Sequence, residues 1–267
     1  MIKSDFHVHT LFSDGSDTPE AIVKAAIKLG LGEIGFSDHA FVSFDDCRIE
    51  KEDRKRYIDE IARLKEKYAG SIGVLCGIEM DYFSEDDVSC YDYVIGSVHY
   101  LKVNGKIYGV DHSPEMTRLC IDEAFKGDTA AFAEAYYEQV SKIRETTGAD
   151  IVGHFDVITK FEKRGINLDT GERYARAAKT ALDSLLPHCA FEISTGAMTR
   201  GYRDTPYPSD AILAYIRENG GRVVVSSDAH TAANVAGKFE VAEKKLSDFG
   251  FSACGFTDKN GVYHSQL

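Results

Sequence analysis

Short apolar stretches alternate with helix-like stretches along almost the whole chain, and this alternation constrains the fold more than any other feature. The apolar stretches predict seven strands, near residues 2–6, 33–37, 73–78, 93–98, 150–153, 189–193 and 222–226. Helical periodicity predicts helices at residues 18–29, 54–68, 132–146, 171–186, 209–219 and 232–249. Strands separated by helices form parallel sheets with right-handed crossovers. The pattern therefore predicts an α/β protein built on one parallel sheet.

The chain is long enough for one closed barrel of this kind. Its 267 residues match the usual size of a parallel αβ barrel. No repeat or Pro/Gly/Ser-rich linker divides it, so we expect a single domain over residues 1–267. A full barrel has eight strands, whereas only seven are found here. The sequence thus predicts a distorted (β/α)7 barrel, similar to a TIM barrel.

Two segments interrupt the alternation. Residues 101–123 contain Asn104-Gly105, which is a tight-turn signal, and they follow a predicted strand. An insertion in that place is typical of a lid or a substrate-binding loop. Residues 251–263 predict a short terminal hairpin with its turn at Asp258 to Gly261.

Side chains that can bind metal ions lie at or just after the ends of most predicted strands. His7 follows the first strand, Glu79 the third and Asp228 the last. The C-terminal ends of all strands in a parallel barrel lie on one face, so we expect these side chains to meet there. The full candidate set is His7, His9, Asp14, His39, Glu79, His99, His154, Asp228 and His230.

The donor types in this set indicate a metal centre. His7 and His9 are two residues apart, so on a strand both rings point to the same side and can bind one ion. A catalytic zinc ion takes three protein ligands and a water, so nine groups suit three ions. Imidazole and carboxylate without thiolate fit zinc, iron or manganese. Neighbouring ions of this kind hold hydroxide at neutral pH and stabilise a displacement at phosphorus.

Two acidic segments near these ligands can also be explained by the local structure of the chain. The run from Asp14 to Asp17 is typical of a turn. Asp38, which precedes His39, either orients a neighbouring imidazole or caps the following segment.

Composition and charge narrow the class of protein. Six cysteines, none in a Cys-x-x-Cys pair, are expected to be free thiols in a reducing cytoplasm, several of them buried. The net charge of −12 and the lack of a Lys/Arg cluster argue against a nucleic-acid partner. No apolar run is long enough to span a membrane, and the N-terminus lacks the layout of a signal peptide. We therefore expect a cytoplasmic protein that acts on a small substrate, while its oligomeric state stays open.

Taken in order, the candidate ligands and their neighbours resemble the motifs of the polymerase-and-histidinol-phosphatase (PHP) family. The resemblance runs from residue 5 to residue 230. It rests on His7-Val8-His9 with Asp14, Ser37-Asp38-His39, Glu79, Ser97-Val98-His99, Gly153-His154 and Ser227-Asp228-Ala229-His230. The chain length and the segments Glu192 to Gly196 and Pro206 to Ser209 are similar to those of the histidinol-phosphatase branch of the family.

The resemblance implies a PHP-type barrel that binds three divalent ions, which are zinc, manganese or iron. By position, the first ion would be bound by His7, His9, Glu79 and Asp228, the second by Glu79, His99 and His154, and the third by Asp14, His39 and His230. The implied reaction is hydrolysis of L-histidinol phosphate to L-histidinol and phosphate, a late step of histidine biosynthesis. A metal-bridging hydroxide held by Glu79 and Asp228 would attack the phosphorus, and no covalent phosphoenzyme is needed.

Substrate contacts are expected from four further residues. Lys160 and Arg200 follow the fifth and sixth predicted strands and can bind phosphate oxygens. Asp111 and His112, in the 101–123 segment, can reach the imidazole or the amine of the substrate. A solvated surface position is the alternative for each of the four.

One departure from the histidinol-phosphatase branch keeps a second interpretation open. Thr199 stands where an arginine is usual in that branch. The alternative is a PHP phosphatase or phosphodiesterase that acts on another small phosphate ester, such as a nucleotide. A non-catalytic metal-binding module, like the PHP segments of polymerases, is a third interpretation. The length, the charge and the intact ligand set argue against it.

Overall fold

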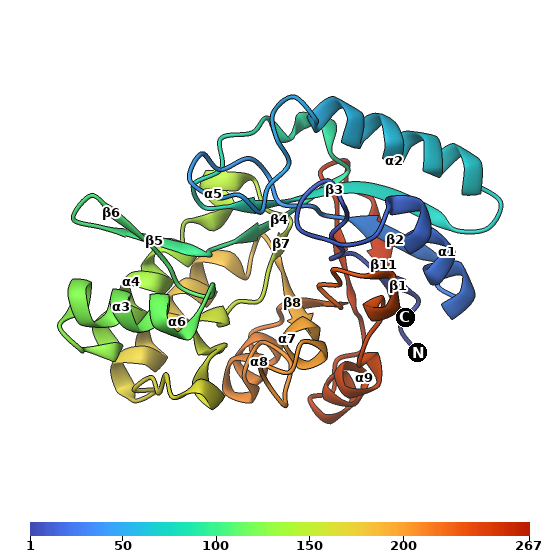
Figure 1. Ribbon diagram of the computed structural model, residues 1–267. Helices are drawn as coiled ribbons and strands as arrows, with labels where there is room; N and C mark the ends of the chain where they lie inside the picture. The colour runs from blue at the N-terminus through green and yellow to red at the C-terminus, as the bar shows by residue number, and fades with distance from the viewer.

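Seven parallel strands form a nearly closed barrel, as the alternation of strands and helices predicts (Figure 1). The computed structural model describes all 267 residues. The barrel strands neighbour one another in chain order, and every pairing between them is parallel. They are β1 (Ser4–Asp5), β2 (Glu33–Phe36), β3 (Gly73–Asp81), β4 (Tyr93–Ser97), β7 (Ile151–Val152), β8 (Ala190–Ser194) and β9 (Arg222–Ser226).

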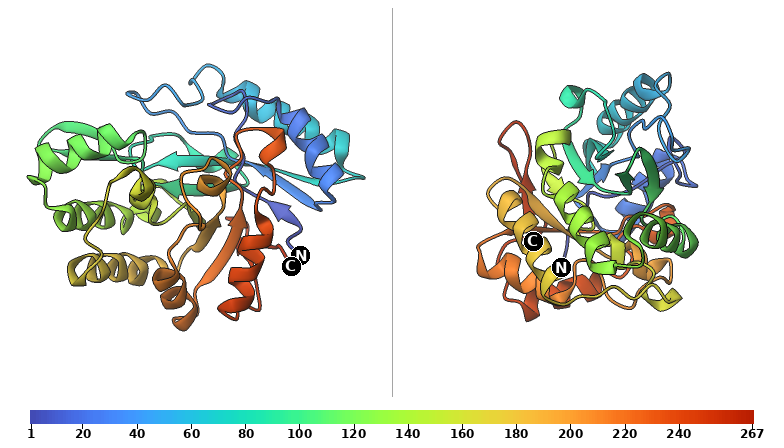
Figure 2. Two further views of the ribbon diagram at one scale, coloured as in Figure 1. Left: turned by 60° about the horizontal axis from the view of Figure 1, so that its bottom comes forward. Right: turned by 90° about the vertical axis from the view of Figure 1, so that its left-hand side faces the viewer.

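The barrel closes between its first and last strands with the help of a side chain from the C-terminal tail. Val8, just after β1, forms a parallel bridge with Ala229, just after β9. The Gln266 side-chain amide donates to the carbonyls of Ser4 and Val225 at 2.9 and 2.7 Å, and its oxygen accepts from the Val225 N–H at 2.7 Å. The two chain ends consequently lie close together (Figure 2).

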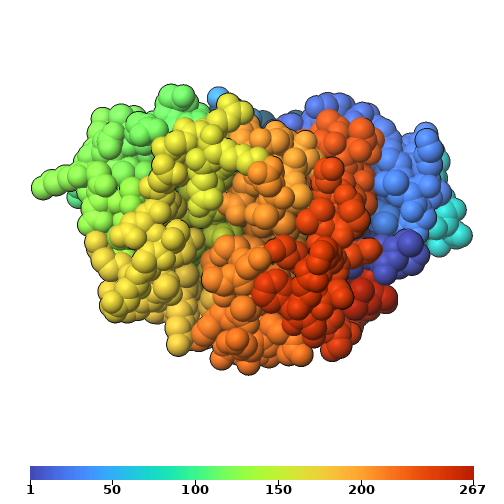
Figure 3. Space-filling view, turned by 90° about the horizontal axis from the view of Figure 1, so that it is seen from below, coloured from blue at the N-terminus to red at the C-terminus, as the bar shows by residue number.

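Helices cover the outside of the barrel. They are α1 (Pro19–Leu29), α2 (Arg54–Tyr68), α3 (Pro114–Phe125), α4 (Thr129–Val140), α5 (Ile143–Thr147), α6 (Glu172–Leu185), α7 (Gly196–Thr199), α8 (Asp210–Glu218) and α9 (Phe239–Asp248). Four 3-10 turns are η1 (Val88–Cys90), η2 (Val157–Thr159), η3 (Glu162–Arg164) and η4 (Ala232–Asn234). Seen from below, the surface runs in chain order from green to red, and the blue N-terminal part lies beside the red C-terminal part (Figure 3). None of the helices is long and apolar enough to cross a lipid bilayer.

Aromatic side chains from β4, from the residue after β1 and from the terminal hairpin pack together inside the barrel. The buried hydroxyl of Tyr93, the first residue of β4, donates to the Phe6 carbonyl at 2.5 Å and lies 3.2 Å from that of Phe36. Phe256, from the terminal hairpin, packs against Phe6 and Tyr93 with ring centroids 5.1 and 5.2 Å apart. The barrel interior around these rings is therefore apolar.

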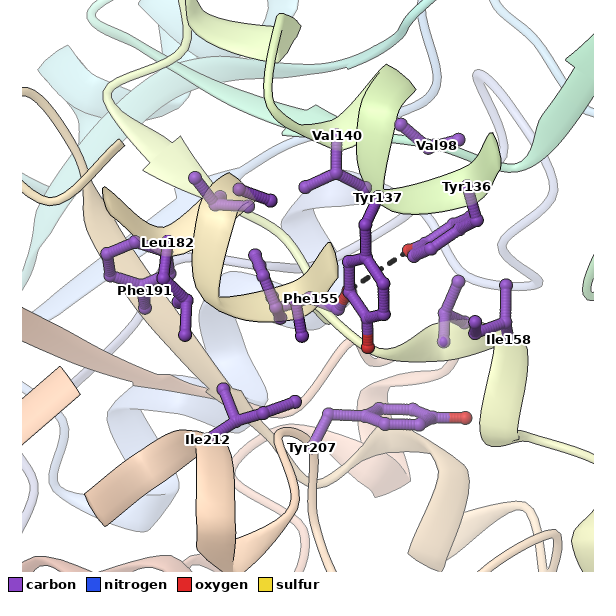
Figure 4. Close-up of a cluster of buried hydrophobic side chains, with 14 of the residues drawn as sticks. Val98, Tyr136, Tyr137, Val140, Phe155, Ile158, Leu182, Phe191, Tyr207 and Ile212 are labelled. Atoms are coloured by element: carbon purple, nitrogen blue, oxygen red, sulfur yellow. Dashed lines mark hydrogen bonds between the residues drawn. The ribbon is translucent and has the colours of Figure 1, made fainter. Parts of the chain in front are cut away.

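A second apolar cluster packs the later strands against α4, α6 and α8 (Figure 4). Tyr136 on α4 donates its hydroxyl hydrogen to the Phe155 carbonyl at 3.1 Å. Tyr137 packs on the Phe155 ring at 5.2 Å and donates to the hydroxyl of Tyr174 on α6 at 2.7 Å. These contacts fix the segment after β7, which carries the candidate ligand His154.

Two predicted helices are shorter than their periodicity indicates. The helix predicted at 132–146 is two helices, α4 and α5. Ser141 and Lys142 separate them, and the Ser141 hydroxyl donates to the Glu138 carbonyl at 2.7 Å, in competition with the helical hydrogen bonds. Ile143 then turns to pack under Gly96 of β4, where a Cβ would lie 2.7 Å from the isoleucine side chain.

The helix predicted at 232–249 begins only at Phe239, after η4. Tertiary contacts hold the intervening backbone out of the helical conformation, with positive φ at Ala236 and Lys238. The Ala236 N–H donates to the Asp5 carboxylate at 2.9 Å, and the Gly237 carbonyl accepts from the Thr195 hydroxyl at 2.6 Å. Both partners are far away in sequence, so local periodicity could not reveal them.

The segment 101–123 is regular structure, which corrects its interpretation as a loop. It contains a hairpin of β5 (Tyr100–Val103) and β6 (Lys106–Gly109), followed by α3. The predicted tight turn at Asn104-Gly105 is confirmed, since both residues have positive φ. The predicted terminal hairpin is also confirmed, as β10 (Gly255–Thr257) and β11 (Tyr263–Ser265). All six cysteines are free, and four of them are buried.

Candidate metal centre

The nine predicted ligands converge at the C-terminal end of the barrel. His39 Nδ1 lies 3.0 Å from Glu79 Oε2, and His154 Nε2 lies 3.2 Å from Glu79 Oε1. The other links between ligands run from 3.1 to 3.9 Å and join His7, His9, Asp14, His99, Asp228 and His230 to the same cluster. The structure thus brings every member of the predicted set into one group.

The cluster has a buried floor and a partly exposed rim. The side chains of His7, His9 and Glu79 are at most 1% exposed. Those of Asp14 and His230 are 25% and 24% exposed. An approaching substrate therefore meets the rim before the floor.

Glu79 lies inside β3 and not after it, which corrects the predicted end of this strand at residue 78. Pairing with β4 extends β3 to Asp81, which lies opposite Ser97. The Ser97 hydroxyl donates to Glu79 Oε1 at 2.6 Å and holds the carboxylate toward the cluster. The Glu79 carboxylate consequently contacts several imidazoles, among them those of His39 and His154.

Asp38 neither orients an imidazole nor caps the segment that follows it, so both of its interpretations are wrong. Its carboxylate accepts from the Thr10 N–H at 2.7 Å, the Thr10 hydroxyl at 3.0 Å and the Ser13 hydroxyl at 2.6 Å. These bonds fix the loop between His9 and Asp14. Asp38 therefore acts on the cluster through the backbone that carries Asp14.

Asp228 is held by its backbone conformation and by Arg200. Its φ of 47° is unusual for a residue other than glycine. Arg200, just after α7, donates to the Asp228 carbonyl at 2.7 Å and to its Oδ2 at 2.5 Å. Burial alone would raise the pKa of Asp228, but Arg200 and His7 hold it well below its usual range. Its other oxygen, Oδ1, lies 3.3 Å from His9 Nε2.

The electrostatics of the cluster favour bound cations. Burial opposes charge on Glu79, yet the surrounding imidazoles hold its pKa well below its usual range. Burial also disfavours a charged His39, but Glu79 and Asp14 raise its pKa to about 10. Carboxylates that stay ionised while they raise the pKa of buried histidines create a strongly negative field. Divalent ions can take the place of those protons.

Unpartnered nitrogen atoms show that the side chains fit metal ions. His7 Nε2 and both ring nitrogens of His9 are buried without a hydrogen-bond partner. His7 Nε2 lies 3.2 Å from a Glu79 oxygen and 3.9 Å from an Asp228 oxygen. An imidazole lone pair that faces two carboxylates needs a cation between them. Three overlapping groups have the geometry to hold an ion: His9, Asp14, His39 and His230; His7, His9 and Glu79; and His39, Glu79 and His99.

A cavity of about 310 Å³ opens over the cluster and contains the four predicted substrate-binding residues. Lys160 donates to the Asp111 carbonyl at 2.8 Å and to its Oδ2 at 3.0 Å. Asp111 Oδ1 is buried without a partner. His112 accepts or donates a 2.9 Å hydrogen bond with the Tyr100 hydroxyl. Arg200 lines the cavity between Asp228 and His230.

The sequence interpretation missed several residues of the site. Asp45, Cys47 and Tyr202 also line the cavity, and they come from loops without a motif of their own. Tyr207 lines it too, and it lies in the segment Pro206 to Ser209, whose resemblance to the histidinol-phosphatase branch gave this residue no role. Glu192 begins the other segment that resembles that branch, but its contact with the site was missed, since its Oε1 lies 2.6 Å from His7 Nδ1. The sequence did contain a signal for this role, because an acid in the middle of an apolar strand requires a buried partner.

Comparison with known proteins decides the family. A model of the PHP domain matches residues 5–196. The chain belongs to the PHP family. Among its curated relatives, a probable histidinol-phosphatase of Deinococcus radiodurans is 30% identical to this PHP protein over 259 residues, which are 92% of this chain and 93% of the relative. The histidinol-phosphatase of Bacillus subtilis is 27% identical, and the match covers 90% of this chain and 98% of the relative.

A solved structure shares the fold of this PHP protein. It is the histidinol phosphate phosphatase of Lactococcus lactis, complexed with zinc, L-histidinol and phosphate. The TM-score is 0.74 at 21% identity, and the match covers 98% of both chains. The predicted PHP-type barrel is therefore confirmed.

Proposed function

We propose that this PHP protein is a metal-dependent phosphomonoesterase that hydrolyses L-histidinol phosphate to L-histidinol and phosphate, as a single cytoplasmic barrel domain over residues 1–267. The observation that carries the proposal is one cavity that joins a cluster of nine metal-binding side chains to the cationic Lys160 and Arg200 and the anionic Asp111. A phosphate ester of an amino alcohol needs both kinds of group, because it is anionic at one end and cationic at the other. The named activities of the curated relatives support the same reaction.

Three divalent ions, of zinc, manganese or iron, are proposed to occupy the cluster. The proposed ligand sets are His7, His9, Glu79 and Asp228 for the first ion, Glu79, His99 and His154 for the second, and Asp14, His39 and His230 for the third. When bound, such ions activate water at neutral pH and neutralise charge on the phosphoryl oxygens. The L. lactis relative binds zinc, which favours zinc among the candidates.

Arg200 and Lys160 are proposed to orient the phosphate. Both are cations on the cavity wall, and Arg200 is only 26% exposed, so its charge is weakly screened. Its guanidinium already lies 2.5 Å from a carboxylate oxygen of the cluster. A phosphate in the cavity would therefore meet a fixed donor next to the ions.

Asp111 is proposed to bind the cationic end of the substrate. Its Oδ2 is paired with Lys160, whereas its buried Oδ1 has no hydrogen-bond partner and lies 3.8 Å from His112 Nδ1. Lys160 and His112 hold the pKa of this carboxyl well below its usual range, although burial opposes the charge. A carboxylate oxygen that accepts no hydrogen bond there favours an ammonium or imidazolium group. His112, beside it on the cavity wall, is proposed to contact the same end.

Another small phosphate ester, such as a nucleotide, is the second candidate substrate because of Thr199. This residue is outside the cavity lining, and its hydroxyl donates to the Gly196 carbonyl at 2.8 Å. Arg200, directly after α7, is thus the cation that this part of the chain contributes to the cavity lining. Selectivity between the two substrates then depends on the anionic Asp111, which a nucleobase does not require.

Phosphate release from histidinol phosphate tests the proposal. The purified protein, loaded separately with zinc, manganese or iron, is assayed with histidinol phosphate and with nucleoside monophosphates. We expect kcat/KM to be highest for histidinol phosphate and turnover to be lost in His99→Ala, which removes a ligand at the cavity wall. Higher kcat/KM for a nucleotide would replace the first substrate with the second. Wild-type turnover by His99→Ala would remove the metal centre from the reaction.

A further inference from the structure

Glu192 is a buried carboxylate in the middle of β8, directly beside the metal centre. Its side chain is 0% exposed. Its neighbours in the strand, Phe191 and Ile193, are fully buried apolar residues. A charged group in such a place is costly unless hydrogen bonds satisfy both of its oxygens. The partners of those oxygens therefore indicate what the acid does.

Three hydrogen-bond donors converge on the two oxygens. Oε1 lies 2.6 Å from His7 Nδ1 and also accepts from the Ser226 hydroxyl. Oε2 accepts from the backbone N–H of His154 at 2.6 Å. A carboxylate offers acceptors on both atoms, whereas the amide of glutamine has one acceptor atom and one donor atom. The surroundings of Glu192 thus require an ionised acid.

We infer that Glu192 is a positioning residue that sets the tautomer of His7 and anchors His154, and thereby supports two of the metal sites. Because Oε1 accepts, the ring proton of His7 lies on Nδ1, which leaves the lone pair on Nε2. That nitrogen is the one that faces Glu79 and Asp228 without a hydrogen-bond partner. A carboxylate behind a histidine ligand fixes its orientation and raises its basicity. The inference rests on the metal centre of the proposed function.

Glutamine at position 192 cannot satisfy both histidines. If its oxygen faces His7, its NH2 group meets the N–H of His154, and two donors oppose each other. If the amide is turned over, NH2 faces His7 Nδ1, so the ring proton has to move to Nε2 and blocks the ligand atom. In either orientation one metal site loses the geometry seen here.

Zinc affinity tests this role, with Asp150→Asn as the matched control for Glu192→Gln. Asp150 is also a buried carboxylate, which accepts from the Val94 N–H at 3.0 Å and contacts none of the nine ligands. In chelator competition with zinc alone, Glu192→Gln is expected to weaken binding at the His7 and His154 sites by roughly 10–100-fold. The site formed by Asp14, His39 and His230 and all sites in Asp150→Asn should keep wild-type affinity.

Nitrogen-15 NMR of the histidine rings tests the tautomer directly. Zinc-loaded wild-type protein is expected to show a slowly exchanging Nδ1 proton on His7, assigned by its absence from His7→Gln, and Glu192→Gln should lack it. The wild-type spectrum alone is informative if Glu192→Gln does not fold. A His7 proton on Nε2, wild-type zinc affinity in Glu192→Gln, or equal weakening at all sites would overturn the inference. Neither measurement uses a substrate, so a failed phosphate-release assay would not affect it.

Discussion

Replacing Gly196 with alanine is expected to disturb the metal centre through a single methyl group. Gly196 begins α7, and a Cβ there would lie 2.7 Å from Asp228 Cβ and from its Oδ2, and 2.9 Å from the Ser227 carbonyl oxygen. Ordinary contact begins at 3.4 Å, so Asp228 or α7 has to move by about 0.7 Å. Asp228 cannot yield easily, because its φ of 47° is already strained and Arg200 binds its carbonyl.

This displacement is large on the scale that metal-dependent catalysis tolerates. A misplacement near 1 Å in a reacting geometry costs on the order of 100-fold in rate. Overpacking of a buried contact costs about 1–3 kcal/mol of stability. We therefore expect Gly196→Ala to stay folded, to bind less zinc and to lose on the order of 100-fold in kcat/KM for histidinol phosphate.

Three measurements check this expectation: steady-state phosphate release, zinc content after removal of free metal, and urea unfolding. Gly70→Ala is the matched control, because a Cβ there meets no atom within 4 Å. The control should keep wild-type activity and zinc content. If Gly196→Ala also kept wild-type activity and zinc content, the close approach of the Gly196 backbone would not be the reason for the position of Asp228.

Three further predictions concern the ions, the phosphate and the C-terminal hairpin. Dialysis against a strong chelator should abolish phosphate release, and added zinc or manganese should restore it; full activity in metal-free protein would contradict the metal centre. Arg200→Ala should lower kcat/KM by roughly 10–100-fold, since a hydrogen bond to a charged group contributes about 1.5–3 kcal/mol, and an unchanged kcat/KM would remove Arg200 from the site. A hydrogen bond to Glu33 raises the pKa of His264, so its contribution to stability is complete below about pH 6.5 and is lost as pH rises through the raised pKa. The urea midpoints of wild type and His264→Gln should therefore approach each other at high pH, and a constant difference would refute this linkage.

Local patterns in the sequence were sufficient to predict most of the barrel. Strands such as β8 and helices such as α2 are bounded where their periodicity ends, because burial of one face is a property of consecutive residues. Capping residues act locally too: Thr18 accepts from the Ala21 N–H at 3.2 Å, as its position before Pro19 predicts.

Predictions failed where a distant partner decides the backbone. The chain near Ala236 follows its bonds to Asp5 and Thr195, and not its own helical periodicity. The length of β3 depends on its pairing with β4, so the place of Glu79 inside the strand could not be predicted from the apolar run alone.

For the candidate site, the sequence by itself determined which donor types are present and that they meet on one face, since parallel strands put their C-terminal ends together. Only the tertiary structure decided which nitrogen of each ring faces which carboxylate, and that Glu192 lies behind His7. It also decided that Gly196 leaves room for Asp228. The physical reason is range: periodicity and capping depend on neighbours in the chain, whereas a buried charge is stabilised by groups that only folding brings within hydrogen-bonding distance.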